Sequence, residues 1–149
     1  MLGKLDIDQM NSLLSSQALG RLACTDGIQP YIIPVTYTYD GNYIYAQTNE
    51  GRKLDILRKN PNVCFQIERM TDMRNWESLL VYGKFEELKS KEAASARNIL
   101  FNRFFPLMTS STVHSFGKET ADEIEDANRI KHVMFRIKIE RMTGRFEKS

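Results

Sequence analysis

One segment near the end of the chain limits the possible folds more than any other. Through residues 133–140, apolar side chains at the odd positions alternate strictly with Met134 and charged side chains at the even ones. Strict alternation is the pattern of a β-strand that buries one face and exposes the other. Such a strand needs hydrogen-bonded neighbours, so the rest of the chain must supply a sheet.

Three further strands are predicted in the first third of the chain, at residues 22–25, 31–39 and 43–47. They are rich in β-branched, aromatic or other apolar residues, which favour strands. The pairs Asp26-Gly27 and Asp40-Gly41 stand between them. Asp-Gly tolerates the positive φ angles of tight hairpin turns, so the three runs are expected to form an antiparallel meander.

The remaining pattern predicts two more strands and several short helices. Further strands are expected at 63–67 and 78–88, and helices at 8–16, 52–59, 92–104 and 119–127. The first helix is expected to carry Met10, Leu13 and Leu14 on one apolar face. Residues 70–75 are expected to form a polar loop, and residues 106–117 an irregular segment. Asp8 is the expected N-cap of the first helix and Gly20 its end, and residues 147–149 are expected to fray. The chain has no internal repeat, no linker and no alternation of strands with helices typical of a parallel sheet. It is therefore expected to form one domain over residues 1–149, mainly β (α+β), an antiparallel barrel with peripheral helices.

Composition excludes several classes of function. The net charge of +2 does not indicate nucleic-acid binding. No apolar run is long enough to cross a membrane, and the first residues lack an apolar signal core, so a cytoplasmic protein is expected. Cys24 and Cys64 lie in apolar runs without metal-ligand spacing, so they are expected to be reduced core thiols, and no metal site is predicted. His114 and His132 belong to no catalytic motif.

The segment Thr48-Asn49-Glu50-Gly51-Arg52-Lys53 is electrostatically unusual. Two cations stand at the start of a predicted helix, where the helix dipole is already positive. A bound phosphate would reverse the sign of this interaction, because backbone N–H groups, the Thr48 hydroxyl, Arg52 and Lys53 could converge on it. The alternative is a solvated basic turn in which Glu50 serves as the local counter-ion.

Two other features are compatible with a ligand. Pro30 and Pro34 cannot donate to a strand ladder, so part of the strand containing Pro34, Val35 and Thr36 is expected at an edge or a bulge. Trp76, the only tryptophan, follows a polar loop and is expected either to stack on a ligand or to pack in the core.

The order of three motifs resembles that of the pyridoxamine-phosphate-oxidase-like superfamily, and within it the nitroimidazole-resistance-type proteins. The first motif is GRLACTDGIQPYIIPV, the second is GRKLDILRKNPNVCF, and the third is NWESLLVYGKFEEL. The resemblance covers roughly the first two-thirds of the chain. It implies a six-stranded split β-barrel that forms a homodimer, with one FMN in each of two clefts between the subunits.

The resemblance also implies which residues contact the flavin. They are Pro34, Val35, Thr36, Gln47, Thr48, Arg52, Lys53, Trp76 and Ser78. Arg52 and Lys53 would hold the phosphate with Thr48 beside them, and residues 34–36 would lie along the ring. Trp76 and Ser78 would reach a flavin cleft, of either subunit.

The chain differs from many nitroimidazole-resistance-type proteins at Gln47, where those proteins have histidine. Glutamine does not titrate near neutral pH, so a reaction that needs a protonated imidazole there is in doubt. The resemblance implies an FMN-dependent oxidoreductase that acts on a small organic molecule, such as a flavin reductase. The alternatives are a non-catalytic flavin carrier or sensor, and a flavin-free structural dimer. Pyridoxamine phosphate oxidase activity itself is not expected, because the longer basic C-terminus of those enzymes is missing, and haem or another flavin in the same cleft is left open.

Overall fold

Six antiparallel strands close into a ring, which confirms the expected barrel. The computed structural model describes residues 1–104 and 131–149. The ring consists of β2 (Leu19–Thr25), β3 (Pro30–Tyr39), β4 (Tyr43–Asn49), β5 (Asn62–Asp72), β6 (Asn75–Glu87) and β7 (His132–Glu147). The strands are ordered β7-β4-β3-β2-β5-β6, and β6 pairs back with β7. A short strand, β1 (Leu2–Lys4), pairs with the end of β7 outside the ring.

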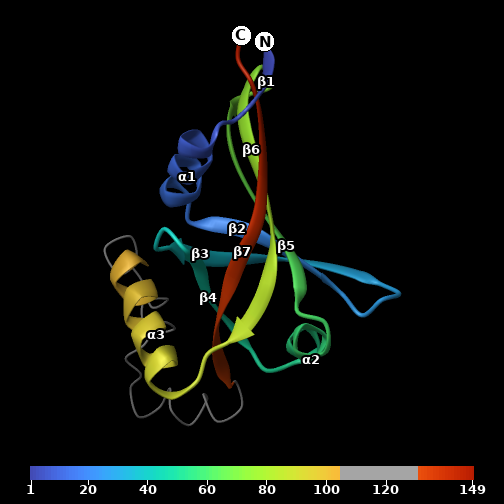
Figure 1. Ribbon diagram of the computed structural model, residues 1–149, viewed down its shortest axis with the longest axis vertical. Coiled ribbons are helices and arrows are strands. Elements are labelled where there is room, and N and C mark those ends of the chain that lie inside the picture. The colour runs from blue at the N-terminus through green and yellow to red at the C-terminus, as the bar shows by residue number, and fades with distance from the viewer. Residues whose placement is uncertain (105–130) are drawn as a thin grey trace.

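Three helices lie against the ring at separate places (Figure 1). They are α1 (Ile7–Ser16), α2 (Arg52–Lys59) and α3 (Ser90–Phe104). The predicted apolar face of α1 is confirmed, because Met10, Leu13 and Leu14 are buried. Helix α3 covers the outer side of β4 and β7, where Tyr45, Met134 and Leu100 form a second small core.

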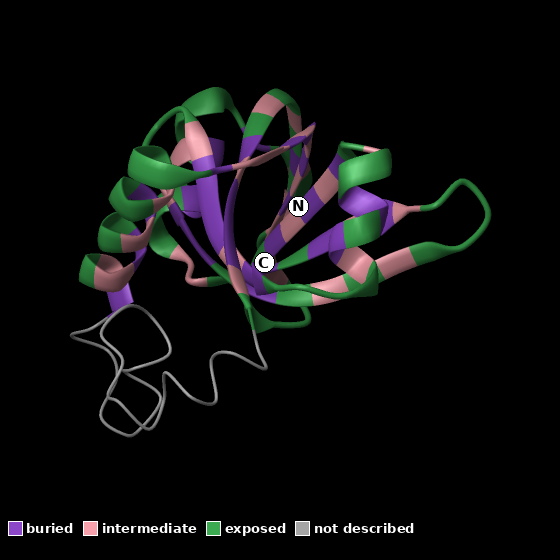
Figure 2. Ribbon diagram, turned by 90° about the horizontal axis from the view of Figure 1, so that it is seen from below, coloured by how far each residue is buried: buried purple, intermediate pink, exposed green. Residues whose placement is uncertain are grey.

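The main core lies inside the ring. Alternate residues of each strand point inward, and Figure 2 shows the buried segments along the strands that enclose this interior. Tyr37 is fully buried there; its ring meets Phe65 edge-to-face at 5.1 Å, and its hydroxyl donates to the Leu14 carbonyl at 2.6 Å. Burial raises the pKa of Tyr37, so this phenol acts as a neutral hydrogen-bond donor that ties α1 to the barrel.

The ring is split between β3 and β4. These two strands pair only over Tyr37–Tyr39 and Ile44–Ala46, whereas β3 pairs with β2 over Leu19–Thr25. Within the described part of the chain, residues 30–36 of β3 therefore have a strand neighbour on one side only. The free edge contains Pro30 and Pro34, as expected for residues that cannot donate to a ladder.

Several expected details are wrong for local reasons. The N-cap of α1 is Asp6, not Asp8, because Asp6 forms a reciprocal capping box with Gln9. Gly20 does not end that helix but lies buried in β2, where a Cβ would come within 2.2 Å of the Phe65 ring.

The C-terminal half of the barrel also has longer strands than expected. The predicted loop at residues 70–75 is mostly strand, because β5 and β6 form one long hairpin. Glu147 does not fray, since it pairs with both β1 and β6. The predicted irregular segment at 106–117, the predicted helix at 119–127 and His114 lie outside the described residues.

Candidate functional site

The split between β3 and β4 contains an unsatisfied polar group. Thr48 lies near the end of β4 on the same face as Ile44 and Ala46, and it is 7% exposed. Its hydroxyl Oγ1 is the only buried side-chain N or O atom among the described residues without a hydrogen-bond partner. Leaving a buried hydroxyl unpaired costs ~1–3 kcal/mol, so this atom indicates a missing partner.

Helix α2 begins four residues after Thr48 with its first N–H groups uncapped. Its N-cap is Gly51, which has no side chain to accept from them. Arg52 and Lys53 occupy the first turn. The guanidinium of Arg52 lies 5.4 Å from the centroid of the Tyr31 ring on β3 and 3.8 Å from the Asp26 carboxylate, and its side chain is 70% exposed. Helix start and free strand edge therefore face each other across the split.

Glu50 does not neutralise these cations. Within the described residues its carboxylate makes a two-pronged contact with the guanidinium of Arg58, at 2.9 and 3.0 Å. Arg58 also contacts Glu87 of β6 at 2.6 and 3.1 Å. These hydrogen bonds lower the pKa of both Glu50 and Glu87. The solvated-turn interpretation assigned Glu50 as the counter-ion of Arg52 and Lys53, and that assignment is wrong.

The residues predicted on β3 do not share one face. Pro34 and Thr36 are exposed, whereas Val35 is buried against the main core. The side chain of Val35 is therefore unavailable to a ligand at the split, and only its backbone could contact one. The same free edge reaches the start of α2 at Tyr31, through the contact of its ring with Arg52.

Gln47 projects to the opposite side of β4 from Thr48. Its amide Nε2 lies 3.2 Å from Nδ1 of His132, the first residue of β7. His132 belongs to no sequence motif, and the contact brings together residues 85 positions apart. Only the register of β4 with β7, in which Asn49 pairs with His132, reveals it.

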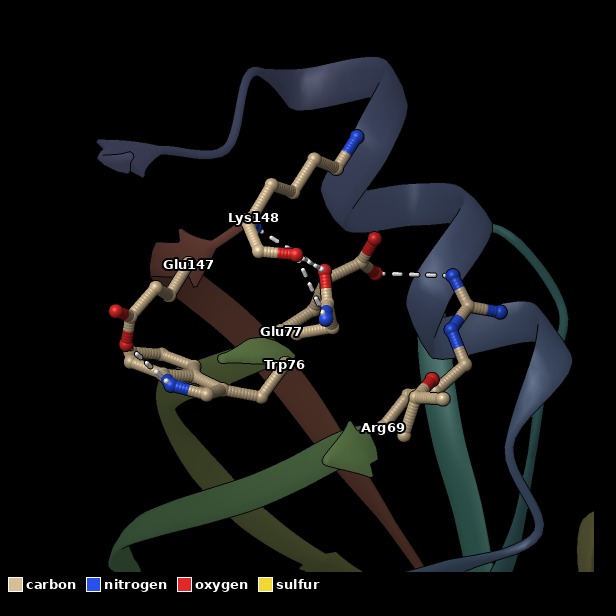
Figure 3. Close-up of a pocket in the computed structure, with 8 residues that line it drawn as sticks. Arg69, Trp76, Glu77, Glu147 and Lys148 are labelled. Atoms are coloured by element: carbon tan, nitrogen blue, oxygen red, sulfur yellow. Dashed lines mark hydrogen bonds and ion pairs between the residues drawn. The ribbon is translucent and has the colours of Figure 1, made fainter. Parts of the chain in front are cut away.

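Trp76 and Ser78 lie far from this group. They belong to the start of β6, beside β1 and the chain termini, whereas α2 lies at the other end of the molecule (Figure 1). Trp76 borders a polar cavity of about 230 Å³, in which its indole Nε1 donates to Glu147 at 3.0 Å (Figure 3). One chain thus brings together residues 48, 52 and 53 with the edge of β3, but not with Trp76 or Ser78.

The two cysteines differ in environment. Both are free; Cys24 is buried in the core as predicted, and burial raises its pKa against the opposing effect of Lys53. Cys64 is only half-buried, on the outer face, so it is not a core thiol. No cluster of three or more potential metal ligands occurs within residues 1–104 and 131–149. In the same ranges, every helix is too short or too polar to span a membrane.

Comparison with known proteins assigns this architecture to a family. The profile of the family described as Pyridoxamine 5'-phosphate oxidase matches residues 6–146. An uncharacterized protein of Rhizobium meliloti is 30% identical over 138 residues, which is 93% of this chain and 90% of that protein.

Solved structures show the same fold. A FAD-binding protein of Mesorhizobium loti superposes with a TM-score of 0.79 at 29% identity, covering 100% of this chain and 98% of that one. A protein of Bacteroides thetaiotaomicron, named as a candidate 5-nitroimidazole antibiotic resistance protein, superposes with a TM-score of 0.68 at 18% identity, covering 98% of this chain and 87% of that one.

Proposed function

Because this chain belongs to the pyridoxamine 5'-phosphate oxidase family, we propose that it binds a flavin by its phosphate at the start of α2. The unpaired, buried hydroxyl of Thr48 carries the proposal, since it is a donor without a partner beside that helix start. The residues present fit a phosphate. The uncapped N–H groups of α2, Arg52 and Lys53 are the donors that bind dianions.

The flavin ring would lie along the free edge of β3 at Pro34, Val35 and Thr36. A strand edge without a neighbour exposes backbone N–H and C=O groups, which match the polar edge of the flavin ring system. We propose FMN as the cofactor. FAD is the second candidate, because the Mesorhizobium loti protein is named as FAD-binding. Heating the purified protein and identifying the released flavin by mass distinguishes the two cofactors.

The second half of the site would come from a second copy of the chain. The outer face of the sheet carries a continuous row formed by Ile32, Ala23, Cys64 and Tyr82 on four adjacent strands. Ile32 is 66% exposed and nearby Leu19 is 50% exposed. A homodimer that buries this face would also allow Trp76 and Ser78 of one copy to approach the flavin of the other. Light scattering tests this proposal, because a dimer has twice the mass of a single chain.

When bound, a flavin supplies hydride or electron transfer, and the protein supplies binding and orientation. We propose an oxidoreductase acting on a small organic molecule in the cytoplasm, with a non-catalytic flavin carrier or sensor as the alternative. Reduction of the bound flavin by NADH or NADPH, followed by reoxidation with a small organic acceptor, separates them. A carrier would show no catalysed turnover.

The phosphate site is tested by the double variant Arg52→Ala/Lys53→Ala. Two charge-assisted contacts worth ~1.5–3 kcal/mol each would be lost, so FMN affinity should fall at least 100-fold. Lys59→Ala, on the exposed end of the same helix, is the matched control and should bind FMN normally. Binding of FMN by the double variant with unchanged affinity would refute the assignment.

A further inference from the structure

Arg58 lies at the far end of α2 from the proposed phosphate site, yet its partner belongs to the site's own loop. Glu50 immediately precedes the N-cap Gly51, and its carboxylate is held in the two-pronged contact with Arg58 described above. The backbone N–H of Glu50 also donates to the Lys131 carbonyl at 2.8 Å. The loop is therefore fixed through both its main chain and its side chain.

If the Glu50 carboxylate were released from Arg58, it would be attracted to the start of α2. A carboxylate is stabilised at a helix N-terminus, where α2 also presents Arg52 and Lys53. There it would occupy the donors that a phosphate needs. The contact with Arg58 keeps the Glu50 carboxylate away from these donors, because a guanidinium holds both carboxylate oxygens in one planar geometry. The ammonium group of a lysine would not hold both oxygens in this way.

Glu87 makes this arrangement rigid. It belongs to the end of β6, and its side chain is 18% exposed, compared with 37% for Arg58 and 34% for Glu50. Two contacts from Glu87 hold the Nε–Nη2 edge of the guanidinium, next to the Nη1–Nη2 edge that binds Glu50. The barrel wall thus holds Arg58, and Arg58 holds Glu50.

We propose that Arg58 is a positioning residue of the phosphate site, which keeps the Glu50 carboxylate away from the donors of α2. The inference rests on the proposed phosphate site and deepens it, because it names the residue that prevents the chain's own carboxylate from competing with the ligand. Without Arg58, the site becomes partly self-inhibited.

The test compares FMN with riboflavin, which has the same ring but no phosphate. Arg58→Gln should weaken FMN binding by about fivefold or more, the effect of one unit charge about 4 Å from a phosphate when water screens the pair. Riboflavin affinity should change less than about twofold. Arg58→Gln/Glu50→Gln should restore FMN affinity, because the released side chain then carries no charge. Dissociation constants come from flavin fluorescence titration of the flavin-free protein.

Three controls make the outcome decisive. Glu87→Gln removes the charge but keeps an amide oxygen that can accept from Arg58, so the Arg58–Glu50 contact should persist and the preference for FMN should be kept. Arg58→Lys keeps the charge but loses the fork, so it should give an intermediate loss and serves if Arg58→Gln folds poorly. Equal weakening of FMN and riboflavin by Arg58→Gln, or no rescue by Glu50→Gln, would overturn the inference. If the double variant Arg52→Ala/Lys53→Ala still prefers FMN to riboflavin as strongly as the parent protein does, the proposed phosphate site itself is wrong.

Discussion

Replacing Thr48 with valine should affect stability and flavin binding in opposite directions. The two side chains have the same shape, but valine buries a methyl group where threonine buries an unpaired hydroxyl. An unpaired buried hydroxyl costs ~1–3 kcal/mol. The flavin-free variant should therefore be more stable than the parent protein by ~1 kcal/mol, or ~3 °C in Tm for a domain of this size.

The flavin-bound protein should show the reverse. If the hydroxyl donates to the phosphate, the variant loses a charge-assisted hydrogen bond of ~1.5–3 kcal/mol, and FMN affinity falls roughly 10–100-fold. Thermal unfolding with and without saturating FMN measures both effects in one experiment. Thr38→Val, at the other buried threonine of the described residues, is the control and should leave FMN affinity unchanged. A Thr48→Val protein that is less stable without flavin and binds FMN normally would refute the reasoning.

Three further predictions concern other parts of the molecule. Gln47→His should raise any flavin-dependent reductase turnover, and the gain should decline across pH 5–8 as the new imidazole loses its proton; equal pH–rate profiles would contradict this. Gly83→Ala should destabilise the protein by ~3 kcal/mol in urea unfolding, because a Cβ there would lie 2.3 Å from a backbone carbonyl of β7. Arg58 lowers the pKa of Glu50 and Glu87 in the folded state. The stability that these two carboxylates give the folded protein is therefore present above the carboxyl pKa of the unfolded chain, and it is lost as the pH falls through their lowered pKa values. Arg58→Gln should therefore flatten the loss of Tm below about pH 4.5.

The sequence predicted the elements of this fold better than their ends. Alternation identified β7 and helical spacing identified α1, because each pattern reflects a face buried in the same core. The end of β7 was missed because its stability comes from partners far away in sequence. Glu147 looks like part of a charged tail, but it pairs with Leu2 and Trp76.

The candidate site was predictable only where its residues are neighbours in sequence. Thr48, Arg52 and Lys53 occur within six positions, so the sequence alone predicted that their hydroxyl and positive charges could act together. The sequence could not predict that the Thr48 hydroxyl is unpaired, because this depends on which atoms surround it in the folded barrel. The contact of Arg58 with Glu87 was missed for a related reason, since it joins residues 29 positions apart through the register of β6.

The open edge of β3 carries a risk for the protein, in addition to its proposed role in ligand binding. An unpaired strand edge can recruit strands from other molecules and start aggregation, most of all before a ligand or partner covers it. Pro30 and Pro34 reduce this risk, because each removes one N–H donor that an incoming strand would need. A flat ligand that needs only a few hydrogen bonds is less affected than a strand that needs a full ladder. The two prolines therefore disfavour a second strand, which needs a continuous ladder of hydrogen bonds, more than a small ligand, which needs only a few. The barrel can then keep an open edge without promoting its own aggregation.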